Sequence, residues 1–560
     1  MNRLIFSLLL LVLGLVVVAC TTPDNAQPRT EETSTPAQPT TLPQPPRIDH
    51  AVVSEQAVVS PARAVADVLG IGPGRQEDGH WPPADYRRDR DQYQPFDSHS
   101  IRRAAEHPVS TFSIDVDTAS YANVRRMLQG GRLPPRDAVR VEEMINYFRY
   151  DYPVPEAGEE PFSVSVEQAV TPWNDRSRLL QIGIRGFQPP PEDVPPANLV
   201  FLIDVSGSMA PPDRLPLVIN GLKLLTAQLG PEDRVAIVVY AGQTGIVLES
   251  TPGSETARIN AALDRLRAAG ATNGGDGIRQ AYALARQGYI EGGINRVILA
   301  TDGDFNVGTA SFEALLDLVR EQRASGVSLT TLGVGRGNYN DRLMDQLAAV
   351  GNGNSAYIDT LAEARKVLVE ERHATLMTIA SDVKIQVEFN PAVVAEYRLI
   401  GYENRLLQRE DFNNDQVDAG DIGANHTVTA LYEVTLVGSG GERVDPLRYG
   451  GSEPITVPAR ADELAFVRLR YKAPEAEDSR LIETPVRVDR LETDASDDLA
   501  FAAAVAAFGQ HLRGGEYLER FALSDIHALA SRSRGPDAEG YRGEFLQLIR
   551  LAESLSVAQR

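Results

Sequence analysis

Between about residues 197 and 375, short apolar runs alternate with segments whose apolar residues recur every three or four positions. Short apolar runs are typical of buried strands, and the longer period is typical of amphipathic helices. The expected strands are Leu199–Asp204, Arg234–Tyr240, Gly245–Glu249, Arg296–Thr301, Ser328–Val334 and Ala356–Ile358. The expected helices are Leu215–Leu229, Glu255–Ala269, Gly277–Gln287, Ser311–Ser325, Asn340–Val350 and Leu361–Arg372. This alternation predicts an α/β fold, a doubly wound and mostly parallel sheet with helices on both faces.

The segments on either side of this unit, residues 197–375, have a different pattern. Residues 108–196 read as an N-terminal α+β region, and the proline-rich stretch Phe187–Pro196 ends it. Residues 376–490 carry the strand patterns Val383–Phe389, Thr427–Leu436 and Leu464–Tyr471, which predict a β-rich, sandwich-like unit. Whether the strands before the α/β unit complete that sandwich is left open. Residues 491–560 predict a C-terminal helical region.

The N-terminus predicts export and lipid attachment. Arg3 precedes the apolar stretch Leu4–Val18, which is too short for a comfortable membrane span. It ends in Val-Val-Ala-Cys20, which resembles a bacterial lipobox. That likeness implies cleavage of a signal peptide, residues 1–19, and lipidation of Cys20. An ordinary signal peptide or a membrane anchor is the alternative.

Residues 20–107 are expected to form a lipidated, Pro/Thr-rich tether with weak order, because this composition cannot build a core. The residue after Cys20 is Thr21 and not the Asp that resembles an inner-membrane retention signal. We therefore expect a lipid-anchored protein of the bacterial cell envelope, in the outer membrane if the cell has two membranes.

Composition narrows the classes of function. The chain has 560 residues and a formal net charge of −22, which argues against nucleic acid as a partner. Its single cysteine allows neither an intramolecular disulfide nor a zinc–thiolate cluster. The 8 histidines are scattered, without the paired spacing of a metalloprotease.

Oxygen-bearing side chains occur at the ends of two of the expected strands and in one loop. Asp204, Ser206 and Ser208 come at the end of Leu199–Asp204 in the pattern D-x-S-x-S. Thr272 lies in a glycine-rich loop, and Asp302 follows Arg296–Thr301. Ligands bind at the carboxyl ends of strands in open α/β sheets, and hard oxygens suit Mg²⁺. These five residues therefore predict a divalent metal site.

The same D-x-S-x-S, isolated Thr and T-D-G residues resemble the metal-ion-dependent adhesion site of von Willebrand factor type A (VWA) domains. The segments Phe112–Arg126, Arg140–Phe148 and Gly337–Asp341 are similar to the YfbK-like bacterial VWA lipoproteins, and the likeness covers most of the chain after about residue 108. It implies a VWA domain over residues 197–375 with Mg²⁺ bound, Mn²⁺ or Ca²⁺ being possible. It also implies a protein partner whose acidic residue completes the site, with Thr272 as the mobile ligand.

Simpler interpretations stand beside this one. Asp204 and the two serines alone could cap the next helix. Asp276 is interpreted as a helix cap, and Asp304 and Asn306 as residues at the rim of the site. The pattern Gly333–Gly337 lacks the Lys-Ser/Thr of a phosphate loop and predicts a turn.

Two further motifs carry alternatives. Asp115-Val-Asp117-Thr118 imitates the nucleophile motif of haloacid-dehalogenase-like phosphatases, and a strand-to-helix junction with capping carboxylates is favoured instead. Asp411–Asp421 resembles a calcium loop but departs from the EF-hand pattern at Gln416 and Ile422, so a solvated acidic loop is favoured.

The sequence thus predicts a membrane-anchored envelope lipoprotein, not an enzyme, whose VWA domain binds an envelope or extracellular protein through a metal ion. The alternative is a scaffolding lipoprotein in which the metal only stabilises the fold. Leu361, Ala364, Val367 and Leu368 should form one apolar face of the last VWA helix. Whether that helix is static or shifts when the site changes ligands is left open.

Overall fold

The structure is a computed structural model that describes residues 91–155, 160–270, 274–303, 312–448, 460, 462–474, 476, 478–489 and 495–558. All of them belong to one compact unit, Pro83–Arg560. The predicted signal peptide, Cys20 and most of the predicted tether lie outside the described residues. In the described part of the chain, no helix is both long and apolar enough to cross a membrane.

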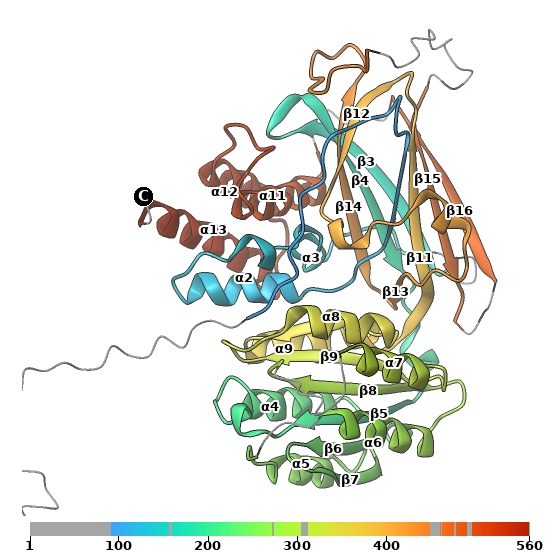
Figure 1. Ribbon diagram of the computed structural model, residues 1–560, viewed down its shortest axis with the longest axis vertical. Helices are drawn as coiled ribbons and strands as arrows, with labels where there is room; N and C mark the ends of the chain where they lie inside the picture. Colours follow the sequence, from blue (N-terminus) through green and yellow to red (C-terminus); the bar gives the residue numbers. More distant parts are fainter. Residues whose placement is uncertain are drawn as a thin grey trace, which may run out of the picture. The chain divides into compact units, whose positions relative to one another are not determined.

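A six-stranded sheet forms the centre of the α/β unit (Figure 1). Its strand order is β10-β9-β8-β5-β6-β7, and only the pairing of β6 with β7 is antiparallel. The strands are β5 (Ala197–Asp204), β6 (Arg234–Tyr240), β7 (Thr244–Pro252), β8 (Ile294–Thr301), β9 (Ser328–Val334) and β10 (Ser355–Ile358). The predicted fold class, a mostly parallel sheet in an α/β unit, is confirmed.

Helices cover both faces of this sheet because its strands are apolar on both sides. Leu199, Phe201 and Ile203 of β5 pack in the same core as residues of α4, α5 and α9. Val200 and Leu202 point to the opposite core, which includes residues of α6, α7 and α8. The helices are α4 (Leu215–Thr226), α5 (Thr256–Asp264), α6 (Gly274–Gln287), α7 (Phe312–Arg323), α8 (Asp341–Val350) and α9 (Leu361–Arg365).

A β-sandwich adjoins the α/β unit, and its strands come from both sides of that unit in the sequence. One sheet has the order β1-β12-β14-β4-β3, with β1 (Arg102–Arg103), β12 (Val394–Ile400), β14 (Thr427–Leu436), β4 (Asn174–Gly186) and β3 (Phe162–Thr171). The other joins β13 (Gly420–Gly423), β11 (Thr378–Phe389), β15 (Glu463–Lys472) and β16 (Ser479–Arg487), with β2 (Val109–Ser113) also paired to β11.

The pairing of β4 with β14 and of β2 with β11 joins residues 108–196 and 376–490 into a single sandwich. Its core holds Phe112 from β2, Leu180 from β4, Ile385 from β11 and Tyr432 from β14. The α/β unit is therefore an insertion between two strands of the sandwich, β4 and β11.

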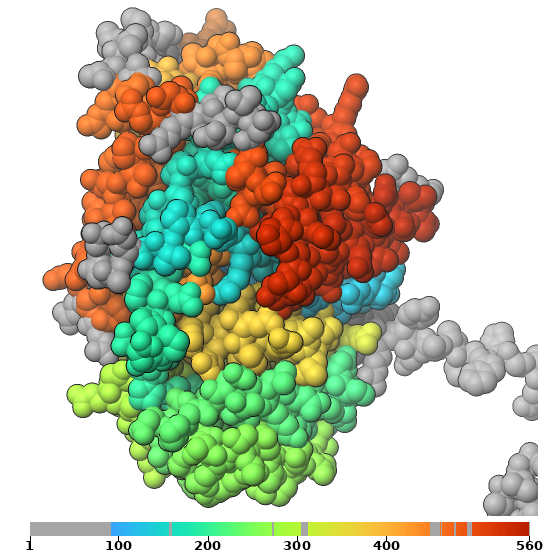
Figure 2. Space-filling view, turned by 180° about the vertical axis from the view of Figure 1, so that it is seen from behind, coloured from blue at the N-terminus to red at the C-terminus, as the bar shows by residue number. Residues whose placement is uncertain are grey.

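A helical cluster packs beside the sandwich (Figure 1). It consists of α2 (Ala119–Gln129), α3 (Val141–Asn146), α11 (Asp497–Leu512), α12 (Leu523–Arg532) and α13 (Tyr541–Ala558), whose apolar residues share one core. Figure 2 shows the last part of the α/β unit, in yellow, between the green part of that unit and the red C-terminal helices. Short helical turns are η1 (Arg136–Ala138), η2 (Pro191–Asp193), η3 (Gly207–Met209), η5 (Glu403–Arg405) and η6 (Arg409–Asn413).

Residues 91–107 are better ordered than their polar composition predicts. The carboxylate of Asp91 accepts hydrogen bonds from the backbone N–H groups of Gly337 and Tyr339, each at 2.9 Å. β1 extends the sandwich by pairing with β12, and Arg513 lies 4.0 Å from the centre of the Phe96 ring. The expectation of weak order up to residue 107 is therefore wrong for this segment, because its polar groups find partners in the folded body.

The last helix of the α/β unit is also different from the prediction. The expected continuous helix is divided into α9, a π-helical turn η4 (Lys366–Glu370) and α10 (Arg372–Leu376). Ala364, Val367 and Leu368 are buried as predicted, but Leu361 is 46% exposed. The apolar face therefore starts one turn later than expected, and the π-turn places Lys366 in the interior.

Candidate metal-binding site

Two adjacent parallel strands carry the acidic residues of the candidate site. β5 and β8 pair in parallel with Ile203 opposite Ala300, so Asp204 at the end of β5 lies near the segment Thr301–Asp302. The side chains of Asp204 and Asp302 are almost fully buried, with 0% and 1% exposure. The structure thus brings the two predicted carboxylates together at the carboxyl edge of the sheet.

Hydrogen bonds hold the Asp204 carboxylate in one orientation. Its Oδ1 accepts from the backbone N–H of Ser206 at 2.8 Å, and its Oδ2 accepts from the Thr301 hydroxyl at 3.0 Å. Burial raises the pKa of Asp204 to about 6, while these hydrogen bonds act in the opposite direction and the charge of Asp302 adds to the rise. Sequence reasoning missed Thr301, although its place in the T-D-G motif was the available signal.

The two serines lie on the turn that follows β5. Ser206 precedes η3 and Ser208 lies within it, and their hydroxyl oxygens are 2.9 Å apart. Met209 is fully buried beneath the turn and anchors it to the core. The backbone N–H of Gly207 donates to the carbonyl of Gly270 at 2.9 Å, so the segment before Thr272 lies along this turn.

The remaining predicted residues have different outcomes. Thr272, Asp304 and Asn306 lie outside the described residues. Asp276 lies in the first turn of α6, where its exposed carboxylate pairs with Arg279 at 3.1 Å. Asp276 is therefore an exposed residue at the start of a helix, and its position does not suit a ligand beside Asp204.

Arg214 is a residue of the candidate site that sequence reasoning did not find. It directly precedes α4, and its buried guanidinium forms an ion pair with Oδ2 of Asp302. It also donates to the carbonyls of Ser208 and Arg336, both at 2.8 Å. A cation at the N-terminal end of a helix is electrostatically unfavourable, and this was the signal that could have revealed another partner for Arg214.

The donor set suits a hard divalent cation. Two buried carboxylates and two neighbouring hydroxyls supply only oxygen, the ligand type that Mg²⁺ prefers. The Arg214 guanidinium already places a positive charge on one of these carboxylates. Within the described ranges, no group of three or more His, Cys, Asp or Glu side chains has the arrangement of a metal cluster.

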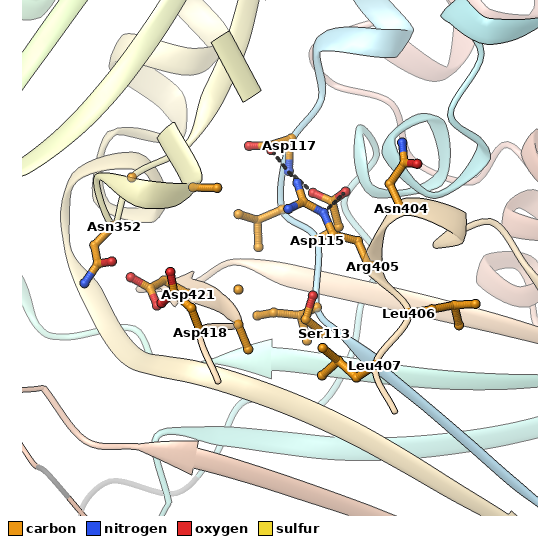
Figure 3. A pocket seen from close by; sticks show the side chains of 16 residues that line it. Ser113, Asp115, Asp117, Asn352, Asn404, Arg405, Leu406, Leu407, Asp418 and Asp421 are labelled. Atoms are coloured by element: carbon orange, nitrogen blue, oxygen red, sulfur yellow. Dashed lines mark hydrogen bonds and ion pairs between the residues drawn. The ribbon is translucent and has the colours of Figure 1, made fainter. Parts of the chain in front are cut away.

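Asp115 and Asp117, which imitate a phosphatase motif, have structural contacts. Oδ1 of Asp115 accepts from the N–H of Asp117 at 3.0 Å, and Oδ1 of Asp117 accepts from the N–H of Ser355 at 2.7 Å. The Arg405 guanidinium donates to the other oxygen of each carboxylate, at 2.9 and 3.0 Å (Figure 3). These aspartates line a cavity of about 210 Å³, and none of the described residues around it is a lysine. They join the end of β2 to the α/β unit.

Lysine side chains fill the loop that resembles a calcium site. The ammonium group of Lys384 donates to the carbonyls of Asp411 and Asn414, and that of Lys472 donates to the carbonyl of Asp415 at 2.7 Å. Backbone carbonyls are ligands that Ca²⁺ would also need. These contacts support the interpretation of Asp411–Asp421 as an acidic loop, which two lysines stabilise, and not as a calcium site.

Comparisons with protein families agree with the fold. Residues 198–371 match the family described as von Willebrand factor type A domain, and residues 374–555 match the family described as uncharacterized protein YfbK, C-terminal. Residues 87–181 match a family described as von Willebrand factor.

The chain is also similar to individual proteins. The chain is 49% identical to the uncharacterized protein YfbK of Escherichia coli (strain K12), over 83% of this chain and 81% of that protein. It is 24% identical to the inter-alpha-trypsin inhibitor heavy chain H3 of Pongo abelii, over 45% of this chain and 30% of that protein. Among solved structures, a von Willebrand factor type A protein from Catenulispora acidiphila covers 68% of this chain and 89% of its own, with 16% identity and a TM-score of 0.39.

Proposed function

Because the chain belongs to the family of VWA-domain proteins that includes YfbK, we propose that its VWA domain binds a protein partner through a divalent metal ion. VWA domains typically serve as protein-interaction modules. The observation that carries the proposal is the meeting of two buried carboxylates, Asp204 and Asp302, with the hydroxyls of Ser206 and Ser208 at one edge of the sheet.

Each residue has a definite task in this proposal. Asp204 and Asp302 supply negative charge, and Ser206 and Ser208 supply neutral oxygens on a turn anchored by the core. Thr272 is proposed as the fifth ligand, by likeness to the family's motif. Bound Mg²⁺, or Mn²⁺ or Ca²⁺ in its place, would offer a coordination position to an oxygen from outside the chain. A carboxylate of an envelope or extracellular protein is the ligand that suits this position.

The proposal assigns no catalytic residue. Among the residues that the structure describes, the Ser206 hydroxyl is hydrogen-bonded to the Ser208 hydroxyl and to no histidine, which is the usual activating base of a serine nucleophile. The fully bonded Asp115 and Asp117 likewise serve the joint between domains.

Metal titration tests the site. Asp204→Ala should abolish Mg²⁺ or Mn²⁺ binding in a calorimetric titration, because it removes one of two carboxylates and leaves the aliphatic sheet core unchanged. Asp302→Ala should do the same. Asp276→Ala is the matched control, since that carboxylate is exposed and pairs with Arg279 of its own helix, and the variant should bind metal like the unaltered protein. Unchanged affinity in both site variants would refute the metal site.

Partner capture then separates adhesion from scaffolding. Crosslinking in intact envelopes, with and without chelator, should yield a partner that Asp204→Ala loses and Asp276→Ala keeps. A partner retained in all of these conditions would instead support the scaffolding alternative, in which the metal only stabilises the fold.

We also propose that the protein is anchored to the envelope through a lipid on Cys20, with residues after Cys20 as the tether. The support is the lipobox-like Val-Val-Ala-Cys20 after an apolar segment. Cys20→Ser should leave the protein unlabelled by a palmitate analogue, because the thioether needs the thiol. Thr21→Ser, which changes the next residue and keeps the thiol, should label normally. Labelling that persists in Cys20→Ser would place the anchor elsewhere.

A further inference from the structure

Arg214 is built into the edge of the sheet that carries the candidate metal site. Its guanidinium bonds to Asp302, to the carbonyl of Ser208 and to the carbonyl of Arg336, which belong to three separate loops. Gly335, at φ +75°, leaves room for it, since a Cβ on this residue would overlap the Arg214 side chain. The side chain is only 8% exposed. These contacts place a permanent positive charge beside the ligands.

The charge of the site follows from these residues. Asp204 and Asp302 contribute two negative charges, and Arg214 contributes one positive charge because a guanidinium does not deprotonate in proteins. These three described charges sum to −1, so a divalent cation leaves the described part of the site with a net charge of +1. Without the guanidinium the same cation would be neutralised by the two carboxylates. Charges interact more strongly in a buried position than in water.

We propose that Arg214 is a resident counter-cation that weakens the binding of metal alone and makes the metal and an external carboxylate bind cooperatively. The inference rests on the proposed function, and it adds how the site is regulated. An anion that joins the site removes the excess positive charge, so it strengthens metal binding. By linkage, metal strengthens binding of the anion by the same factor.

Arg214 and the metal need not exclude each other. A carboxylate accepts several bonds, so Asp302 can accept from the guanidinium and still ligate a cation, directly or through water. A purely structural role for Arg214 predicts the opposite sign. If the guanidinium served only to hold the three loops together, its removal would loosen the ligands and weaken metal binding.

The test measures Mn²⁺ binding by electron paramagnetic resonance, with acetate as the external carboxylate. Arg214→Gln should bind Mn²⁺ alone at least ten-fold more tightly than the unaltered protein. Acetate should strengthen Mn²⁺ binding at least five-fold in the unaltered protein and less than two-fold in Arg214→Gln. Arg214→Lys keeps the charge and should resemble the unaltered protein. Arg214→Met is a second uncharged variant that keeps the packing against Gly335, in case Arg214→Gln does not fold.

Arg258→Gln is the control. Its guanidinium is 59% exposed and pairs with Glu255 at 3.2 Å, away from the contacts of Arg214, so its loss should leave Mn²⁺ affinity unchanged. Equal or weaker Mn²⁺ binding by folded Arg214→Gln and Arg214→Met would overturn this inference while the metal site stands. Absence of Mn²⁺ binding in the unaltered protein and in both uncharged variants would overturn the proposed metal site itself, and the inference with it.

Discussion

At the scale of single residues, aspartates that follow strands have different roles because of their partners. Asp115 and Asp117 come after β2 and are saturated by Arg405 and by backbone N–H groups. Asp204 is the last residue of β5, and its carboxylate accepts one hydrogen bond from a backbone N–H and one from a hydroxyl. The pattern of an acidic residue after an apolar strand is the same in both places, so it cannot tell a joint from a ligand site.

Buried glutamates give the molecule a pH dependence that can be measured. Glu142 is 1% exposed, and its Oε2, like that of Glu403, has no hydrogen-bond partner in the described part of the chain. Burial, and then the charge of Glu403, raises the pKa of Glu142 to about 8, above its usual value of 4.5. Between these two pH values the folded protein keeps a proton that the unfolded chain has lost. The free energy of unfolding should therefore fall as pH rises through this window.

Glu142→Gln should remove this part of the pH dependence. In urea unfolding it should be more stable than the unaltered protein at pH 8, by about 2–4 kcal/mol at 1.4 kcal/mol per pKa unit, and the difference should shrink toward pH 5. Glu255→Gln, at an exposed pair with Arg258, should follow the unaltered protein at both pH values. The prediction would be contradicted if Glu142→Gln and the unaltered protein lost the same free energy of unfolding between pH 5 and pH 8.

At the scale of elements, the last helix of the VWA domain is tied to the helical cluster. Arg125 of α2 pairs with Asp359 and with Glu363 of α9, the latter at 2.7 Å. Lys366 in the π-turn pairs with Glu371 at 2.7 Å and lies 4.3 Å from the centre of the Tyr147 ring. These buried contacts favour a static helix over one that shifts.

Hydrogen exchange tests the static helix. Protection of residues 361–372 should be the same with and without Mg²⁺, because the ion pairs to α2 do not involve the candidate ligands. A change in protection when Mg²⁺ is added would show that the helix moves with the site.

Removing Arg125 should loosen the same element. Arg125→Gln leaves Asp359 and Glu363 buried without their cation, which typically costs about 3–5 kcal/mol, and exchange over 361–372 should rise. Arg365→Gln is the control on the same helix, since its guanidinium is 67% exposed and pairs with Glu370 at the surface. In Arg365→Gln, hydrogen exchange of residues 361–372 should remain unchanged. Equal exchange of these residues in Arg125→Gln and Arg365→Gln would show that Arg125 does not hold the helix.

At the scale of the whole molecule, Arg405 joins the sandwich to the VWA domain. Its guanidinium pairs with Asp115 and Asp117 from the segment after β2, at 2.9 and 3.0 Å (Figure 3). It also pairs with Asp345 from α8 at 3.0 Å. The inserted VWA domain is therefore held by ion pairs as well as by its two covalent connections. This arrangement suggests that the domains unfold together.

Arg405→Ala should destabilise the whole body. It leaves three carboxylates without their shared cation, so the free energy of unfolding in urea should fall by about 3–5 kcal/mol. Arg320→Ala, at an exposed pair with Asp317, should change it by less than about 1 kcal/mol. Limited proteolysis of Arg405→Ala should cleave residues 187–196, the connection into the VWA domain, faster than in the control. If Arg405→Ala lowered the free energy of unfolding no more than Arg320→Ala does, Arg405 would not be the residue that joins the sandwich to the VWA domain.

Apart from the last helix, the sequence alone determined the elements of the VWA domain and the position of its acidic residues. Strand and helix periods are local, and Asp204 and Asp302 directly follow apolar runs, so a parallel sheet necessarily brings them to one edge. The family resemblance, confirmed by 49% identity to YfbK over 83% of the chain, added the expected ligand set.

Only the tertiary structure decided the rest. The pairing of β4 with β14 joins Leu180 to Tyr432, residues about 250 positions apart, and strand patterns do not identify partners at that distance. The placement of Arg214 on Asp302 likewise depends on where two loops meet, 88 positions apart in the chain. Hydrophobic periodicity reports which face of an element is buried, whereas the partner of a buried charge is set by the packing of elements that are distant in sequence.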